Sequence, residues 1–366
     1  MGSSSPAPAR SAEIRSDRPR ATRAQDGVMA LVSLWLISGL VLDAWAHSNR
    51  PGLETFFTPW HAVFYSGFAA TAGWVAWLVW RQRRAGRRGW AAVPLGYGPT
   101  VLALVVFGLS GVADMVWHTV FGIEESIDIL FSPSHLGLAV AMGVIVTTPV
   151  RSIWHDPAPD TLARLWPALL GIGLAVAEIM VFLEYGNALL MRANWIVTGL
   201  SSTENNSAAT LAVRMLVTNA ALLLPLLFVA RRWGLPPGAA TLCTVPVLVL
   251  SGAETGGRNM STLLSVLVAA MGADVLARAL RPEAGRPRAF WAFAAAVPLF
   301  TWSLYLGVAS AAVGRLPEIP ELWTGAPIVA SAVGLLLGAL MLPGASLDQT
   351  AGSGCGAAVS DASARS

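Results

Sequence analysis

The chain alternates between long apolar runs and short polar stretches. Ten of the apolar segments are long enough, or nearly so, to cross about 30 Å of hydrocarbon. The fourth and seventh are the shortest, and a Gly-Gly-Arg-Asn link after the seventh would also allow a re-entrant hairpin. The pattern predicts an all-α integral membrane protein with about ten transmembrane helices. These run roughly over 27–47, 60–80, 97–118, 134–150, 165–185, 208–230, 239–254, 260–280, 289–310 and 325–343.

The composition agrees with a membrane protein. Hydrophobic residues make up 55% of the chain, charged residues only 12%, and the mean hydropathy is +0.60. Soluble domains carry about 25% charged residues. Residues 1–26 and 348–366 are rich in small and polar residues, so we expect disordered tails, and the first lacks the layout of a signal peptide. The basic residues are arginines in loops and tails, which argues against nucleic-acid binding.

Arginine placement predicts the orientation in the membrane. Arginines cluster before the first segment and after the second, fourth, sixth and eighth, whereas the alternate loops hold few. Because cytoplasmic loops carry the excess of basic residues, both termini should be cytoplasmic. The loops with few arginines hold only Arg50, Arg192, Arg258 and Arg315.

Carboxylate and imidazole side chains repeat near the outer ends of the first four segments. Asp43 and Asp114 are 71 residues apart, and so are His47 and His118. After a three-residue insertion the offset becomes 74, which relates His61 to His135 and also Glu54, Phe57 and Pro59 to Asp128, Phe131 and Pro133. The repeat predicts two helical hairpins, 27–80 and 97–150, followed by a six-helix region over 151–347.

The local chemistry of each hairpin favours a metal site. Asp and His at i and i+4 share one helix face. Thr58 and Ser132 are suited to cap the returning helices, with Pro59 and Pro133 at the first helical position, so the later histidine falls in the first turn. An aspartate inside the membrane costs up to about 3 kcal/mol, which a bound cation would offset. A proton relay or a hydrogen-bonded polar cluster is the rival interpretation. The predicted ligands are Asp43, His47, His61, Asp114, His118 and His135, at one dinuclear or two mononuclear sites.

Other acidic residues are candidates for orienting these ligands. Glu54 and Asp128 precede the returning histidines, Glu124 and Glu125 follow His118, and Glu178 lies in the fifth segment. Glu178 either supports the ligands or pairs with an arginine such as Arg214 or Arg192. A cysteine-based site is excluded, because the chain has two cysteines far apart in sequence.

Both hairpins resemble the metal sites of the C subunit of copper-containing membrane monooxygenases, the particulate methane and ammonia monooxygenases. The resemblance covers about residues 40–150 and rests on the Asp-x3-His pairs, on Phe57-Thr58-Pro59-Trp60-His61 and Phe131-Ser132-Pro133-Ser134-His135, and on His118-Thr119 before Glu124-Glu125. The histidine spacings here are longer than that family's by one and three residues, and Asp114 stands where that family has Asn. The resemblance implies copper; iron and zinc also suit such ligands.

Three functions follow as expectations. The first is a copper-dependent monooxygenase, or its metal-holding subunit, in the cell membrane. It would oxidise a small apolar substrate arriving through lipid, with electrons from a quinol or an outer redox partner and with further subunits as the resemblance implies. The second is a copper transporter or sensor, and the third is a zinc-dependent membrane hydrolase. No residue is assigned a catalytic role by the sequence.

Overall fold

The computed structural model describes residues 18–49, 57–121, 131–154, 156, 161–202 and 206–342. Within the first helix, the side chains of residues 47 and 48 lie outside this description. The described residues are helices, 3-10 turns and connecting loops, with no strand among them. The predicted tails, 1–26 and 348–366, fall largely outside the described residues.

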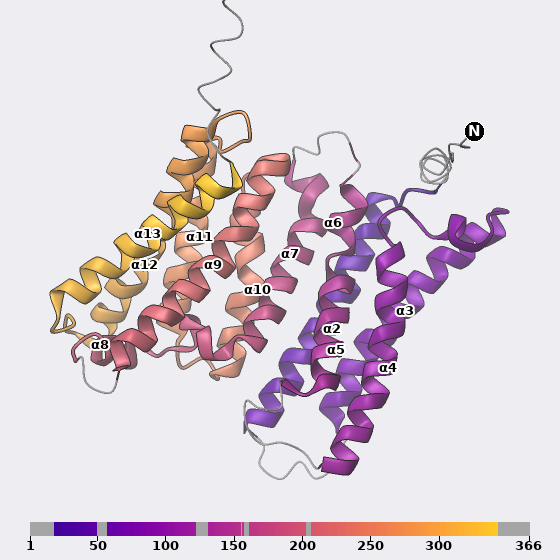
Figure 1. Ribbon diagram of the computed structural model, residues 1–366, viewed down its shortest axis with the longest axis horizontal. Coiled ribbons are helices and arrows are strands. Elements are labelled where there is room, and N and C mark those ends of the chain that lie inside the picture. The colour runs from indigo at the N-terminus through magenta and orange to yellow at the C-terminus, as the bar shows by residue number, and fades with distance from the viewer. Residues whose placement is uncertain are drawn as a thin grey trace, which may run out of the picture.

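The first part of the fold is a pair of helical hairpins (Figure 1). Helix α2 packs against α3, and α4 packs against α5, while α6 continues the direction of α5. The short 3-10 turn η1 (Gly89–Ala92) lies between the hairpins. The helices are α2 (Arg23–Asn49), α3 (Pro59–Arg84), α4 (Gly98–Phe121), α5 (Pro133–Val146) and α6 (Thr148–Ile153).

The second part of the fold is a larger bundle, joined to the hairpins by packing of α2 against α7. Two 3-10 turns, η3 (Glu184–Gly186) and η4 (Ala188–Leu190), and the short helix α8 connect α7 to α9. Long helices that follow one another along the chain run in opposite directions, so the chain passes up and down through the molecule (Figure 1). The helices are α7 (Leu162–Phe182), α8 (Ala193–Gly199), α9 (Ser207–Trp233), α10 (Ala239–Glu254), α11 (Met260–Leu280), α12 (Pro287–Val313) and α13 (Pro320–Met341).

Each of the ten predicted segments contains a helix, but not all are long enough to cross a membrane. Among the described residues, eight helices have the length and hydropathy of membrane spans. Helices α5 and α10 have 14 and 16 residues, so each rises only about 21–24 Å. The all-helical membrane class is therefore supported, while ten full spans are not established.

The shortness of α5 has a local cause. Pro149 has no N–H to donate to the carbonyl of Ile145, so the helical ladder is interrupted. The Thr148 hydroxyl donates to that carbonyl instead, at 2.6 Å. The chain bends at Thr147 and continues as α6.

The two sides of the molecule differ in charge. Helix α2 begins and α13 ends on the same side (Figure 1). That side also carries the arginine-rich ends of α3, α9 and α11, whereas the predicted ligands lie at the opposite ends of α2 to α5. The two ends of the described chain therefore share a side.

Glycines bring the helices of the first hairpin into close contact. A Cβ atom on Gly67 would lie 2.7 Å from the Cα atom of Leu36, and one on Gly39 would lie 2.6 Å from that of Phe64. Small residues of this kind let membrane helices approach backbone to backbone. Between the hairpins, Phe68 of α3 stacks on Phe107 of α4 with ring centroids 4.3 Å apart. These contacts fix where the ends of α2, α3 and α4 lie.

Candidate metal centre

Three of the predicted ligands meet where α4 ends and α5 begins. Asp114 and His118 lie one turn apart on the same face of α4, and His135 lies in the first turn of α5. The side chains of Asp114 and His118 are each 2% exposed, and that of His135 is 19% exposed. The cluster is thus buried on the α4 side and opens slightly toward His135.

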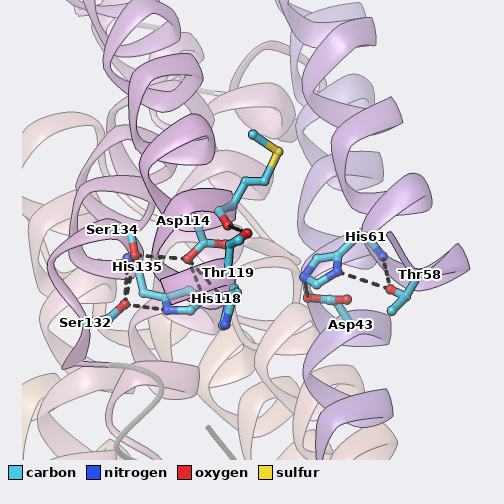
Figure 2. A network of polar contacts seen from close by, with 10 residues as sticks. Asp43, Thr58, His61, Asp114, His118, Thr119, Ser132, Ser134 and His135 are labelled. Carbon is cyan, nitrogen blue, oxygen red and sulfur yellow. Dashed lines mark hydrogen bonds and ion pairs between the residues drawn. The ribbon is translucent and has the colours of Figure 1, made fainter. Parts of the chain in front are cut away.

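The ligand atoms of these residues converge on one carboxylate oxygen (Figure 2). Asp114 Oδ1 lies 3.6 Å from His118 Nε2 and 3.4 Å from His135 Nε2. The two imidazole rings are 5.6 Å apart at their centroids and inclined by 66°. One ligand atom from each residue lies within 4.8 Å of the other two. This group could therefore hold a metal ion.

The spacing of these atoms fits an ion better than direct hydrogen bonds. N–H···O hydrogen bonds span about 2.7–3.2 Å, so 3.4 and 3.6 Å are too long. Two metal–ligand bonds of about 2.0–2.1 Å at a tetrahedral angle place the ligand atoms about 3.3–3.4 Å apart. A carboxylate and two imidazoles are also a common ligand set for iron, copper and zinc. The residues present therefore fit a transition metal.

The helix start of α5 aims His135 at the carboxylate. Ser132 caps the helix by accepting the His135 backbone N–H at 3.2 Å, and Pro133 occupies the first turn. The Ser132 hydroxyl also lies 2.7 Å from His135 Nδ1. Because this contact holds one ring nitrogen, the other nitrogen, Nε2, points toward Asp114. The predicted cap is confirmed, and it orients the ring as well as starting the helix.

The first hairpin repeats this design. Thr58 caps α3 by accepting the His61 backbone N–H at 3.1 Å, and its hydroxyl lies 3.1 Å from His61 Nδ1. His61 Nε2 then faces Asp43 Oδ2 at 3.4 Å. The third predicted ligand, His47, has a side chain outside the described residues. The structure therefore brings together two of the three ligands predicted here.

The two hairpins form separate clusters in the described part of the chain (Figure 2). Asp43 and His61 are not in the group whose ligand atoms lie within 4.8 Å of one another. Tyr65 lies between the clusters: its ring is 6.3 Å from that of His61, and a Cβ on Gly111 would lie 3.2 Å from its hydroxyl oxygen. Both Asp43 and Asp114 act on it electrostatically. The arrangement favours two neighbouring sites over a single shared one.

The other predicted acidic residues do not join these clusters in the described structure. Glu178 is buried in α7, and a Cβ on Gly143 of α5 would lie 3.7 Å from its Oε2. Its pairing with an arginine is not borne out, because Arg214 donates instead to the carbonyls of Glu184 and Asn187. Glu54, Glu124, Glu125 and Asp128 lie outside the described residues.

Two polar residues were missed as members of the site by sequence reasoning. Ser134 donates its hydroxyl hydrogen to Asp114 Oδ1 at 3.0 Å, and Tyr65 separates the two clusters. Ser134 is adjacent in sequence to the predicted ligand His135, so its position could have indicated a role in the site. Tyr65 gave none, because an aromatic residue in an apolar helix is ordinary.

Comparison with known proteins finds no match to this chain. No family model matches the sequence, no curated protein matches it, and no solved structure matches the fold.

Proposed function

We propose that this chain is a multi-pass membrane protein that holds a transition-metal ion between Asp114, His118 and His135. The observation that carries the proposal is the spacing of two imidazole nitrogens, of the buried His118 and the partly exposed His135, around the buried Asp114 Oδ1. A buried carboxylate without a compensating cation would be costly in a membrane. The cluster of Asp43 and His61 is the corresponding site of the first hairpin, with His47 as its expected third ligand.

We propose copper as the metal. Two imidazoles and a carboxylate accept copper, iron or zinc, so the ligand set alone does not choose. The resemblance of both hairpins to the C subunit of copper-containing membrane monooxygenases supports copper. When bound, copper would supply one-electron chemistry and oxygen activation. The chain's own residues hold the ion, and the burial of Asp114 and His118 excludes water from one side of it.

We place the metal end of the hairpins at the extracytoplasmic face. The opposite ends of the helices carry most of the arginines, and basic residues accumulate on the cytoplasmic side. Both termini would then be cytoplasmic.

The activity proposed is that of a monooxygenase-like oxidoreductase or of its metal-holding subunit. Helix α4 exposes Val112, Val116 and Val120 on the face opposite to Asp114 and His118, as expected for contact with lipid. The substrate we propose is a small apolar molecule that arrives through the lipid around these helices. Partner subunits and a quinol or outer redox partner would be needed to supply electrons.

Transport of copper is less well supported. A transport path needs further ligand groups at other depths in the membrane. Among the described residues, the cluster at Asp114 is the only group of three or more His, Cys, Asp or Glu with such spacing. A zinc hydrolase needs a nucleophile or general base, and the acidic residues that the sequence offers for this role, Glu54 and Asp128, lie outside the described residues.

Metal analysis of purified protein tests the proposal. We expect copper in the parent chain and a clear loss in both His118→Ala and His135→Ala, because each removes one of three ligands. His155→Ala, which lies outside both predicted hairpins, is the matched control and should keep the parent metal content. A parent protein that stays metal-free after exposure to copper, iron and zinc would refute the metal site, and zinc alone would refute copper.

A further inference from the structure

We infer that Ser132 and Ser134 form a hydroxyl relay that fixes the tautomer of His135, making Nε2 the nitrogen that binds the ion. The inference rests on the proposed metal site, because it assigns the atoms with which that site binds. Neither serine is a ligand of the ion, because each contacts a ligand residue instead. They are positioning residues.

The relay begins at the carboxylate. Ser134 donates its hydroxyl hydrogen to Asp114 Oδ1 at 3.0 Å. An ionised carboxylate has no hydrogen to return, so it can only accept. The single hydrogen of Ser134 is therefore committed to Asp114.

The next bond follows from that commitment. The hydroxyl oxygens of Ser132 and Ser134 are 3.0 Å apart. Since Ser134 has no further hydrogen, Ser132 must donate in this bond. The single hydrogen of Ser132 is therefore committed to Ser134.

The last bond fixes the imidazole. Ser132 Oγ lies 2.7 Å from His135 Nδ1 and also accepts the His135 backbone N–H at 3.2 Å. With its own hydrogen already used, Ser132 can only accept, so Nδ1 must carry the proton. Ser132 then uses its full capacity of one donor and two acceptor positions.

The consequence falls on the other ring nitrogen. A neutral imidazole protonated at Nδ1 has a lone pair at Nε2, and this lone pair faces Asp114 Oδ1 at 3.4 Å. Two electron-rich atoms held in this way repel each other unless a cation lies between them. The relay therefore prepares the site for an ion before the ion arrives.

The first hairpin lacks this relay. Trp60 stands where the second hairpin has Ser134, and Thr58 contacts His61 through its hydroxyl. No second hydroxyl at position 60 consumes the Thr58 hydrogen, so this pattern does not select one tautomer of His61. The two hairpins therefore differ in how strongly they prepare a histidine for metal.

The test compares Ser134→Ala with Ser134→Thr in the full-length protein. We expect Ser134→Ala to bind copper about 10–100-fold more weakly, because partners of metal-ligating groups contribute that much to affinity. Ser134→Thr keeps a hydroxyl and should stay within a few-fold of the parent. Unchanged copper affinity in Ser134→Ala would overturn the relay.

A second measurement does not depend on metal binding. Nitrogen NMR of His135 in chelator-treated protein, labelled at histidine, should show Nδ1 protonated in the parent and a mixture of tautomers in Ser134→Ala. Protonation at Nε2 in the parent would overturn the relay even if copper binds. A parent that shows the Nδ1 tautomer but binds no metal would refute the metal site and leave the relay standing.

Discussion

At the scale of single residues, the site depends on a carboxylate kept in an apolar setting. The side chain of Asp114 is 2% exposed, and an unpaired buried charge is strongly unfavourable. The Ser134 hydroxyl stabilises it with one hydrogen bond, while both imidazoles lie beyond hydrogen-bonding distance of Oδ1. A bound cation would therefore supply much of the stabilisation that the buried Asp114 carboxylate needs.

Asp114→Asn separates metal binding from folding. Asparagine has nearly the same shape and can still accept from Ser134, but it removes the charge. We expect copper affinity to fall by at least about 100-fold, more than the loss of a supporting hydrogen bond costs. In the presence of chelator the variant should melt at the parent temperature or above, because the buried charge is gone.

Thermal unfolding in detergent, with and without copper, measures this effect. The parent should be stabilised by copper, since an ion that binds only the folded state raises stability. The variant should not respond. A variant that gains as much stability from copper as the parent would show that Asp114 is not a ligand.

At the scale of helices, the hairpins bring their ligands together because their backbones touch. Gly67 of α3 lies against the backbone of Leu36 on α2. That contact sets the distance between the ends of the two helices, where Asp43 faces His61. The ligand geometry is thus a product of packing well away from the ligands.

Gly67→Ala should disturb this packing. The added methyl group would lie 2.7 Å from the Leu36 Cα atom, which cannot rotate away as a side chain can. We expect destabilisation of about 1–3 kcal/mol, typical of an overpacked contact. Gly73→Ala in the same helix is the control, because a Cβ there meets nothing within 4 Å. Equal unfolding temperatures for the two variants would contradict this account of the hairpin.

The sequence predicted the hairpins well because their signals are local. The spacing of Asp and His and the Thr58-Pro59 and Ser132-Pro133 starts specify helix ends, and the structure has those caps. The place of Tyr65 could not be predicted, because it depends on contact with Gly111, a residue of another hairpin. The environment of Glu178 was equally hidden, since its neighbour Gly143 lies on α5 and an apolar pattern does not specify which helices meet.

At the scale of the whole molecule, the arginine-rich helix ends and the candidate metal ligands lie on opposite sides. Helix α3 ends at Arg84 on the arginine-rich side, whereas α12 ends at Val313 on the side of the ligands. A chain that crosses the molecule an even number of times ends on the side where it began. The arrangement predicts one orientation in the membrane.

Labelling of introduced cysteines tests that orientation. In a Cys355→Ser background, where the remaining Cys243 is buried, Arg315→Cys should react with a membrane-impermeant maleimide in intact cells and Arg88→Cys should not. Both positions are exposed at opposite ends of the helices. After permeabilisation both should react, which controls for access. The reverse pattern in intact cells would place the metal cluster at the cytoplasmic face.

The unequal exposure of the three ligands bears on how an ion would leave. Asp114 and His118 are each 2% exposed, and only His135, at 19%, borders open space. A competing chelator would therefore have to replace the imidazole of His135 before it could reach the remaining bonds. Removal of the ion would be slow and would follow a single order of bond breaking, with small chelators acting faster than bulky ones. The geometry would thus protect a bound ion kinetically as well as bind it.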